Sequence, residues 1–201
     1  MKLALVGLDK DLLDSLGDQV VAIFDPKIRG DVWGIPVIGS DDAWPAYKAA
    51  HPEVRPLIAI DPPALRRKLA DHYGYRDMAS FVAPTARLSK RAYLGAGVVI
   101  QHDVFVSADV RLDDGVRVNV GAQIHHDCVL GGFATVAPGA ALMGSVTVGA
   151  AAYIGAGSVI LQGGAIGDGA TVGAGAVVTR PVAPGETVIG APAGPLSMRK
   201  R

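Results

Sequence analysis

The stretch that decides the fold runs from residue 99 to residue 136 and reads VIQHDVFVSADVRLDDGVRVNVGAQIHHDCVLGGFATV. Every sixth residue in it is a branched aliphatic, and the same spacing continues on both sides without a break. An α-helix repeats its buried positions about every 3.6 residues and a strand every two, so a period of six indicates a repeated supersecondary unit. The aliphatic positions are Val82, Leu88, Leu94, Ile100, Val106, Leu112, Val118, Ile124, Leu130, Val136, Leu142, Val148, Ile154, Ile160, Ile166, Val172 and Val178.

A second register of compact residues accompanies the first. Two positions before each aliphatic, from Ala86 to Ala176, stands Ala, Val, Cys, Ser or Gly. We interpret each hexad as a short strand plus a corner, with the aliphatic side chain pointing inward and the compact residue packing beside it. Three hexads make one triangular coil of 18 residues, and stacked coils pair as parallel strands around a buried column of aliphatics. The sequence predicts an uninterrupted β-helix of nearly six coils over residues 81–201, C-terminal tail included.

Residues 1–80 follow a different pattern, in which short apolar runs alternate with helical segments. This alternation predicts a small, Rossmann-like α/β domain with a parallel sheet. We expect strands over residues 2–8, 19–25 and 56–61, helices over 11–16, 41–50 and 64–73, and a loop over 30–39 (GDVWGIPVIG).

The first strand and helix of this domain suggest a nucleotide site. A strand–turn–helix followed by a strand that ends in an acidic residue can bind a nucleotide, so Gly7 and Asp25 are candidate substrate contacts. The turn itself, Gly7 to Asp11 (GLDKD), has one glycine and two carboxylates in place of a glycine-rich fingerprint. Carboxylates repel a diphosphate, and Lys10 offsets only part of that repulsion. A packed domain without a phosphate site is therefore an open alternative.

Composition excludes several classes of function. The chain has 19 basic and 19 acidic side chains, and this balance disfavours nucleic-acid or anionic-membrane partners, which select for excess Lys and Arg. No charged residue lies between Asp127 and Asp168, but the six-residue period and Pro138 argue against a transmembrane helix. A single cysteine, Cys128, permits no intrachain disulfide, and the N-terminus lacks a signal-peptide pattern. We expect a cytoplasmic protein.

Polar residues interrupt the repeat most clearly over residues 119–127 (NVGAQIHHD). His125 and His126 follow the inward Ile124, so they occupy a corner and point outward. His126 could act as a general base, with Asp127 fixing its tautomer through the far ring nitrogen. Gly144 lies one full coil after His126 and should stack beside it, where its backbone N–H could stabilise an oxyanion.

These residues resemble the bacterial sugar N- and O-acetyltransferases of the sialic-acid and bacillosamine pathway type. The resemblance rests on Asn119, on His126 followed by Asp127, and on the run Cys128-Val129-Leu130-Gly131. The family's C-terminal pattern is present in residues 177–179 (VVT) and 188–193 (VIGAPA), and a looser match covers residues 34–39 and 59–61. The sequence departs from the family at the degraded glycine motif of the N-terminal domain and at Thr135, where the family often has His.

The resemblance implies a left-handed β-helix, assembly as a homotrimer and acetyl-CoA as donor, bound between adjacent helices. It implies N-acetylation of the amine of a nucleotide-linked amino sugar, with His126 as base, Asp127 as its orienting partner and Gly144 as oxyanion donor. Asn119 is a candidate substrate contact by way of a neighbouring subunit, and His125 is either a substrate contact or a solvated corner residue. The residues expected to contact CoA are Gly144, Gly155, Ala156, Ala174 and Pro192.

Two alternatives keep the fold and change the function. The acceptor could be a hydroxyl of a sugar or of serine. The β-helix could instead be a zinc enzyme like the hexapeptide carbonic anhydrases, or a scaffold. A zinc site would draw on His102, His125 and His126, but His102 and His126 are 24 residues apart and so fall on different corners. Cys128 belongs to the compact inward register, which predicts a core residue and not a nucleophile.

Overall fold

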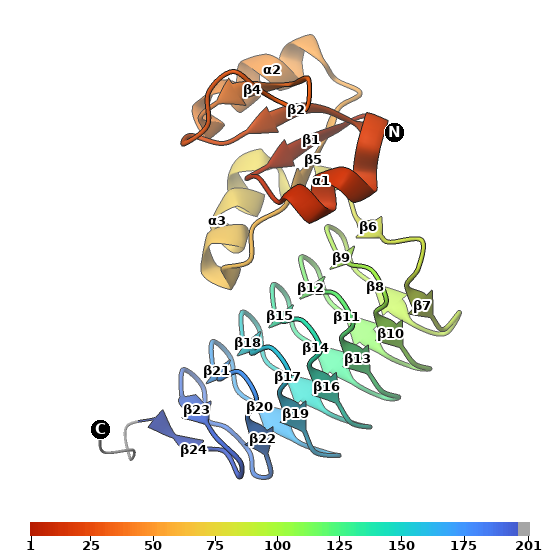
Figure 1. Ribbon diagram of the computed structural model, residues 1–201, viewed down its shortest axis with the longest axis vertical. Coiled ribbons are helices and arrows are strands. Elements are labelled where there is room, and N and C mark those ends of the chain that lie inside the picture. Colours follow the sequence, from red (N-terminus) through yellow and green to blue (C-terminus); the bar gives the residue numbers. More distant parts are fainter. Residues whose placement is uncertain (197–201) are drawn as a thin grey trace. The chain divides into compact units, whose positions relative to one another are not determined.

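The computed structural model describes residues 1–196 and divides the chain into two compact units, residues 1–80 and the residues from 81 onward. The basic tail at 198–201 lies outside the described residues. Figure 1 labels the elements of both units. The first unit contains β1 (Leu3–Val6), α1 (Lys10–Leu16), η1 (Gly17–Gln19), β2 (Val20–Phe24), β3 (Asp31–Val32), β4 (Ile35–Gly39), η2 (Asp41–Ala43), α2 (Trp44–Ala50), β5 (Arg55–Ile58), α3 (Pro63–Tyr73) and η3 (Tyr75–Asp77).

The first unit is the predicted small α/β domain. Its sheet has the order β3-β4-β2-β1-β5, with β4, β2, β1 and β5 parallel. The chain moves from β1 to β2 and then returns to the other side of β1 as β5, so the strand order reverses at β1. The core contains Phe24, whose ring meets Trp44, Tyr47 and Tyr73 edge-on at centroid distances of 5.5, 5.4 and 5.9 Å.

The prediction of a loop over residues 30–39 is wrong. Val32 pairs with Ile35, which leaves Trp33 and Gly34 as a two-residue turn with φ values of 54° and 81°. Two positive φ values are the signature of a type I′ hairpin turn. β4 then joins the main sheet beside β2. Glycines and Pro36 obscure this strand in the sequence, and its second pairing partner, β2, lies outside the segment.

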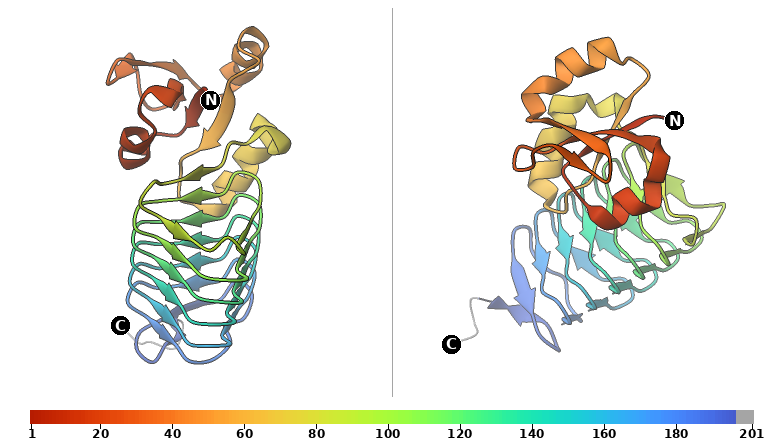
Figure 2. Two further views of the ribbon diagram at one scale, coloured as in Figure 1. Left: turned by 90° about the vertical axis from the view of Figure 1, so that its right-hand side faces the viewer. Right: turned by 45° about the horizontal axis from the view of Figure 1, so that its top comes forward.

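The second unit is a β-helix in which every hexad contributes one strand (Figures 1 and 2). Its strands are β6 (Phe81–Val82), β7 (Arg87–Leu88), β8 (Tyr93–Leu94), β9 (Val99–Ile100), β10 (Phe105–Val106), β11 (Arg111–Leu112), β12 (Arg117–Val118), β13 (Gln123–Ile124), β14 (Val129–Leu130), β15 (Thr135–Val136), β16 (Ala141–Leu142), β17 (Thr147–Val148), β18 (Tyr153–Ile154), β19 (Val159–Ile160), β20 (Ala165–Ile166), β21 (Thr171–Val172), β22 (Val177–Val178), β23 (Thr187–Ile189) and β24 (Gly194–Pro195).

These strands form three sheets, one for each face of the triangular coil. The first face has the order β22-β19-β16-β13-β10-β7, the second β20-β17-β14-β11-β8, and the third β24-β23-β21-β18-β15-β12-β9-β6. Phe105 pairs with Gln123 in parallel, 18 residues on, and the other coils follow the same register up to β22. The predicted coil of three hexads without inserted loops is therefore confirmed.

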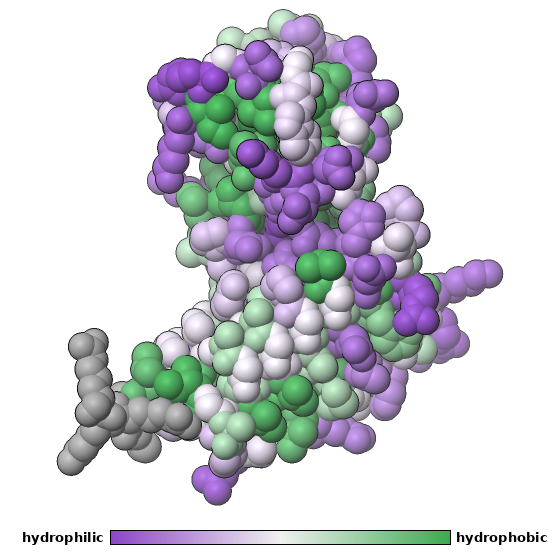
Figure 3. All heavy atoms as spheres, in the orientation of Figure 1, coloured by the Kyte–Doolittle hydropathy of each residue, from purple (hydrophilic) through white to green (hydrophobic). Residues whose placement is uncertain are grey.

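The column of aliphatic residues is the core. Ile100, Ile124, Leu130 and the intervening members are fully buried, and they form one continuous cluster. The first coil is the exception, because no coil precedes it: Val82 has 39% of its surface exposed, and Leu88 and Leu94 are only partly buried. Outward residues of the later coils are mostly uncharged, and Figure 3 shows pale and green side chains gathered there. No helix within residues 1–196 is long and apolar enough to cross a membrane.

Candidate active site

The corner that joins the first face to the second carries the predicted base. We call it the His126 corner; it comprises the turns at 89–92, 107–110, 125–128, 143–146 and 161–164. Between β13 and β14, Ile124 points into the core with no exposed surface, and the next residues project outward. The side chains of His126 and Asp127 are 55% and 58% exposed. His126 and Asp127 lie in the turn that follows β13, and this turn exposes both polar groups to solvent.

Asp127 holds the imidazole of His126. Its Oδ2 lies 2.8 Å from His126 Nδ1. Because a carboxylate can only accept, this contact places the proton on Nδ1 when the ring is neutral and leaves Nε2 as a free base. Asp127 has a φ of 59°, a conformation that Asp tolerates better than most residues, and its backbone N–H donates to Ala108 O at 3.1 Å. The turn therefore fixes the carboxylate beside the ring.

Gly144 stacks against the same imidazole from the following coil, as the 18-residue spacing predicts. A Cβ at this position would lie 2.6 Å from Cε1 and 2.7 Å from Nε2 of His126, so the Nε2 edge of the ring faces Gly144. The Gly144 carbonyl accepts from Gly163, but nothing within residues 1–196 accepts from its N–H. A free backbone donor thus lies beside a free imidazole nitrogen.

The expected CoA contacts differ in what their amides can do. Ala156 and Ala174 lie on the corner that joins the third face to the first, which we call the Asn119 corner. Neither N–H is engaged by any group of the described chain. Gly155 differs, because its N–H donates to Val172 O at 2.8 Å in the ladder between coils. Its N–H is therefore engaged in the fold, and it would hold pantetheine only if this hydrogen bond were broken.

Close packing between successive coils explains why residue 155 is a glycine. A Cβ there would lie 2.5 Å from Val172 O and 2.6 Å from Ala174 N, so the next coil could not approach. Pro192, the last of the expected CoA contacts, is exposed between β23 and β24. Its neighbour Ala193 donates to Val177 O at 2.8 Å and ties this segment to the last coils.

The two candidate substrate contacts of the β-helix are separated. His125 is half-buried on the His126 corner, with its ring 6.0 Å from that of Phe105. Asn119 is buried on its own corner, where its Oδ1 accepts from Arg117 Nε at 2.8 Å. The structure does not bring Asn119 to His126 within one chain. Contact between Asn119 and a substrate at His126 would require a second copy and a change in the Arg117 interaction.

Gly7 and Asp25 are both engaged inside the first unit. Gly7 ends β1 with a φ of 78°, and its N–H donates to Phe24 O at 2.8 Å. The carboxylate of Asp25 accepts from the backbone of Leu8 at 3.2 Å and of Lys27 at 2.9 Å. Asp25 therefore stabilises the turn that follows β1. The Asp25 oxygens that a nucleotide at this turn would contact therefore already accept hydrogen bonds from those two N–H groups.

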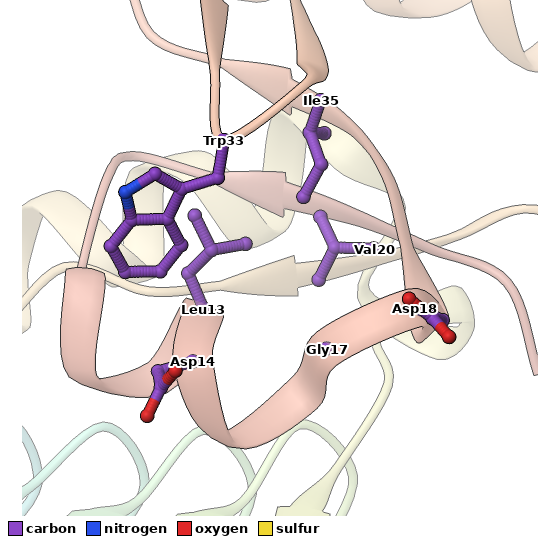
Figure 4. Close-up of a pocket in the computed structure, with 7 residues that line it drawn as sticks. All are labelled: Leu13, Asp14, Gly17, Asp18, Val20, Trp33 and Ile35. Atoms are coloured by element: carbon purple, nitrogen blue, oxygen red, sulfur yellow. The ribbon is translucent and has the colours of Figure 1, made fainter.

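Two hollows escaped the sequence analysis. One, of about 380 Å³, lies on the first face and is lined by Arg87, Asp103, Phe105, Gly121, Gln123 and His125. Its floor residues 87, 105 and 123 recur at 18-residue intervals one position before inward aliphatics, a signal that the sequence contained. The other, of about 330 Å³, lies in the first unit, where Trp33 and Ile35 of the β3–β4 hairpin face α1 (Figure 4).

The remaining reactive groups are accounted for. Cys128 is buried, its Sγ donates to Met143 O at 3.1 Å, and burial raises the pKa of its thiol. It is a core residue, as predicted. Among residues 1–196 no group of three or more His, Cys, Asp or Glu side chains is placed to hold a metal ion.

Comparison with known proteins identifies the family. No protein-family model matches the sequence. The chain is nevertheless 32% identical to the acetyltransferase domain of PglB from Neisseria gonorrhoeae, solved with acetyl coenzyme A, over 97% of this chain and 98% of that one, with a TM-score of 0.89. The chain belongs to the hexapeptide-repeat sugar N-acetyltransferases.

Another member of this acetyltransferase family is similar over the same length. PerB from Caulobacter crescentus, solved with CoA and GDP-perosamine, is 33% identical over 97% of both chains, with a TM-score of 0.87. A GDP-perosamine N-acetyltransferase from the same organism, with one histidine replaced by alanine, also holds CoA and GDP-perosamine; it is 33% identical over 97% of this chain and 96% of that one, with a TM-score of 0.88. The match to these acetyltransferases includes the left-handed β-helix and the α/β unit.

Proposed function

We propose that the protein transfers the acetyl group of acetyl-CoA to the amine of a nucleotide-linked amino sugar. The observation that carries this proposal is the geometry of the His126 corner. A histidine with one nitrogen held by a carboxylate presents its other nitrogen to a glycine whose N–H is free. A base next to an oxyanion donor is the minimum that direct acyl transfer to an amine requires.

In the proposed mechanism His126 Nε2 takes a proton from the amine as the amine attacks the acetyl carbonyl. The Asp127 carboxylate keeps the ring in the reactive tautomer and stabilises the imidazolium that forms. The Gly144 N–H donates to the carbonyl oxygen as it gains charge. When the C–S bond breaks, the proton on His126 is available to the departing sulfur. No acyl-enzyme is needed, and Cys128 is buried too deeply to form one.

Acetyl-CoA would supply an acetyl group activated as a thioester. The residues present fit an elongated, amide-containing donor, because the unengaged N–H groups of Ala156 and Ala174 follow one another at successive coils. The PglB domain with acetyl coenzyme A and PerB with CoA support this assignment. GDP-perosamine in PerB supports a nucleotide-linked amino sugar as acceptor. In the first unit, the carboxyl ends of β1 and β5, where the strand order reverses, are the place for the nucleotide.

We further propose that the active protein is a homotrimer that works in the cytoplasm. Ala156 and Ala174 lie on the Asn119 corner, whereas Gly144 lies on the His126 corner, so one chain does not offer all three amides to the same ligand. A neighbouring copy would bring its Asn119 corner to the His126 corner. Sedimentation would test this assembly: a monomer at assay concentration with full activity would exclude it.

The test of the function is release of free thiol from acetyl-CoA across a panel of UDP-, dTDP- and GDP-linked 4-amino sugars. Free serine and sialic acid are the controls for hydroxyl acceptors. Cys128 does not interfere with a thiol reagent, since burial raises its pKa and keeps it protonated. Turnover with one amino sugar supports the proposal. Turnover with a hydroxyl acceptor alone, or with none, would contradict it.

A further inference from the structure

The hollow on the first face lies beside the His126 corner and has the chemistry of a carbohydrate site. We call it the Arg87 groove, after Arg87, and define it by Arg87, Asp103, Phe105, Gly121, Gln123 and His125. An aromatic ring forms part of its floor, and around the ring stand a guanidinium, an amide, an imidazole and a carboxylate. Ligand sites combine apolar surface with a few converging polar groups in this way.

Arg87 is the cation of the groove that no carboxylate neutralises. Its guanidinium lies over the Phe105 ring, 5.6 Å from the centroid. Within residues 1–196 it takes part in no ion pair, whereas Arg91 pairs with Asp109 and Arg111 with Asp113. A guanidinium stacked on a ring keeps its N–H fork free, and that fork matches the oxygens of a phosphate.

The groove also has a defined position along the helix axis. It spans β7, β10 and β13, the strands of the coils that precede Gly144. Coils stack about 4.8 Å apart, so Arg87 lies roughly 10 Å along the axis from Gln123. Gly144, whose N–H is the proposed oxyanion donor, lies on the other side of His126, one coil later. The two sides of His126 therefore offer different surfaces to the two substrates.

We infer that the Arg87 groove binds the sugar phosphate of the acceptor, with Arg87 on the phosphate attached to the sugar and Phe105 under the sugar ring. His125 and Gln123 would bind sugar hydroxyls. Asp103 accepts hydroxyl hydrogens at the edge away from His125. The inference rests on the proposed function and assigns the sugar phosphate of its acceptor to this groove.

Binding of small probes tests the groove without relying on turnover. Wild-type protein should bind glucosamine 1-phosphate, and Arg87→Ala should bind it roughly ten- to hundred-fold more weakly, the usual loss when a charged hydrogen-bond partner is removed. The methyl glycoside of glucosamine, which has no phosphate, should show the same affinity for both proteins. Calorimetry gives all four values. Absent binding to wild type, or equal binding of the phosphate by both proteins, would overturn the inference.

Arg111→Ala is the matched control, because Arg111 also lies over an aromatic ring, that of Tyr93 at 4.9 Å, but on the second face. It should leave both affinities unchanged; an equal loss would show that the effect is not specific to the groove. Phe105→Leu is the second variant, and it should weaken both probes because the platform serves the sugar. Sedimentation of each variant confirms folding and assembly.

Kinetics with the acceptor identified by the thiol-release panel separates this inference from the proposed function. Arg87→Ala should raise the acceptor KM roughly ten- to hundred-fold and leave the acetyl-CoA KM unchanged. A raised acetyl-CoA KM instead would mean that Arg87 serves a phosphate of CoA, and the inference would fail while the function stands. If no panel member is acetylated, the proposed function fails and the calorimetric result still decides the groove.

Discussion

The His126 corner and the turn after β2 each place an aspartate at a bend of the chain, and the two carboxylates have different partners. Asp127 directs its carboxylate to a side chain, His126, which remains half exposed. Asp25 directs its carboxylate to two backbone N–H groups of its own unit. In the β-helix the backbone of each coil is largely satisfied by its neighbours, and at some corners carboxylates such as Asp114 and Asp168 accept from further N–H groups. The Asp127 carboxylate instead holds a side chain, whereas that of Asp25 stabilises turns of the α/β unit.

The largest expected effect breaks the β-helix itself. Leu130→Asp would place an unpaired carboxylate in a fully buried position and should destabilise the protein by more than about 4 kcal/mol. Val129→Asp is the control from the same strand, because Val129 points outward with 38% of its surface exposed, and it should change stability by less than about 0.5 kcal/mol. Thermal unfolding measures both. Equal stabilities would refute the inward and outward assignment.

The next effect removes the base. His126→Ala should lower kcat by roughly 10²–10⁴-fold with thermal stability unchanged, because the side chain is exposed and its proposed role is proton transfer. His51→Ala, at the end of α2 before β5 begins, is the control and should retain wild-type turnover. The assay is thiol release with the identified acceptor. Near-normal kcat in His126→Ala would remove it from the mechanism.

Gly144→Ala tests whether turnover depends on the packing of the His126 ring against residue 144. Its φ is not positive, so alanine is tolerated by the backbone, but its Cβ would meet the His126 ring at 2.6 Å and displace it. A displaced base costs roughly 10²-fold in kcat. Gly132→Ala is the control, since its nearest contact would be an ordinary 3.4 Å to Asp114 O. If both variants turn over alike, the imidazole does not work at this position.

Replacing Asp127 should change kcat, whereas replacing Asp25 should change the free energy of unfolding. Asp127→Asn keeps the shape and tolerates the positive φ, so we expect unchanged thermal stability and roughly a 10- to 10²-fold loss of kcat from a wrongly held tautomer. The pair of measurements is a melting curve and a turnover assay. A large drop in melting temperature with normal kcat would assign Asp127 to the turn and not to the imidazole.

The smallest effect belongs to the other aspartate. Asp25→Ala removes the acceptor of two backbone N–H groups in a partly exposed turn, which should cost about 1–2 kcal/mol. Urea unfolding would show this as a lower midpoint with an unchanged slope. Stability equal to wild type, together with a weaker affinity for the acceptor, would reverse the comparison and make Asp25 a ligand-binding residue.

Prediction from sequence succeeded where structure is local and periodic. The inward positions, the coil length and the stacking of Gly144 on His126 all follow from one spacing. It failed at residues 30–39, where a strand interrupted by glycines and Pro36 forms a hairpin with β3 and also pairs with β2. It also did not show that the Gly155 N–H is engaged, because the sequence does not show which N–H groups the next coil consumes. The Arg87 groove could have been predicted from residues 87, 105 and 123, because their 18-residue spacing places them side by side on one face of the β-helix.

The sequence by itself determined the β-helix, the small α/β unit and the pair of His126 with Asp127, because adjacent residues and an unbroken period of 18 fix their neighbours without further information. The tertiary structure alone decided which amides are free. It leaves Ala156 and Ala174 unengaged and commits Gly155, it buries Asn119 against Arg117, and it leaves Arg87 without a carboxylate. The physical reason is that hydrogen bonds and ion pairs are saturable, and only the assembled coils show which groups are still available.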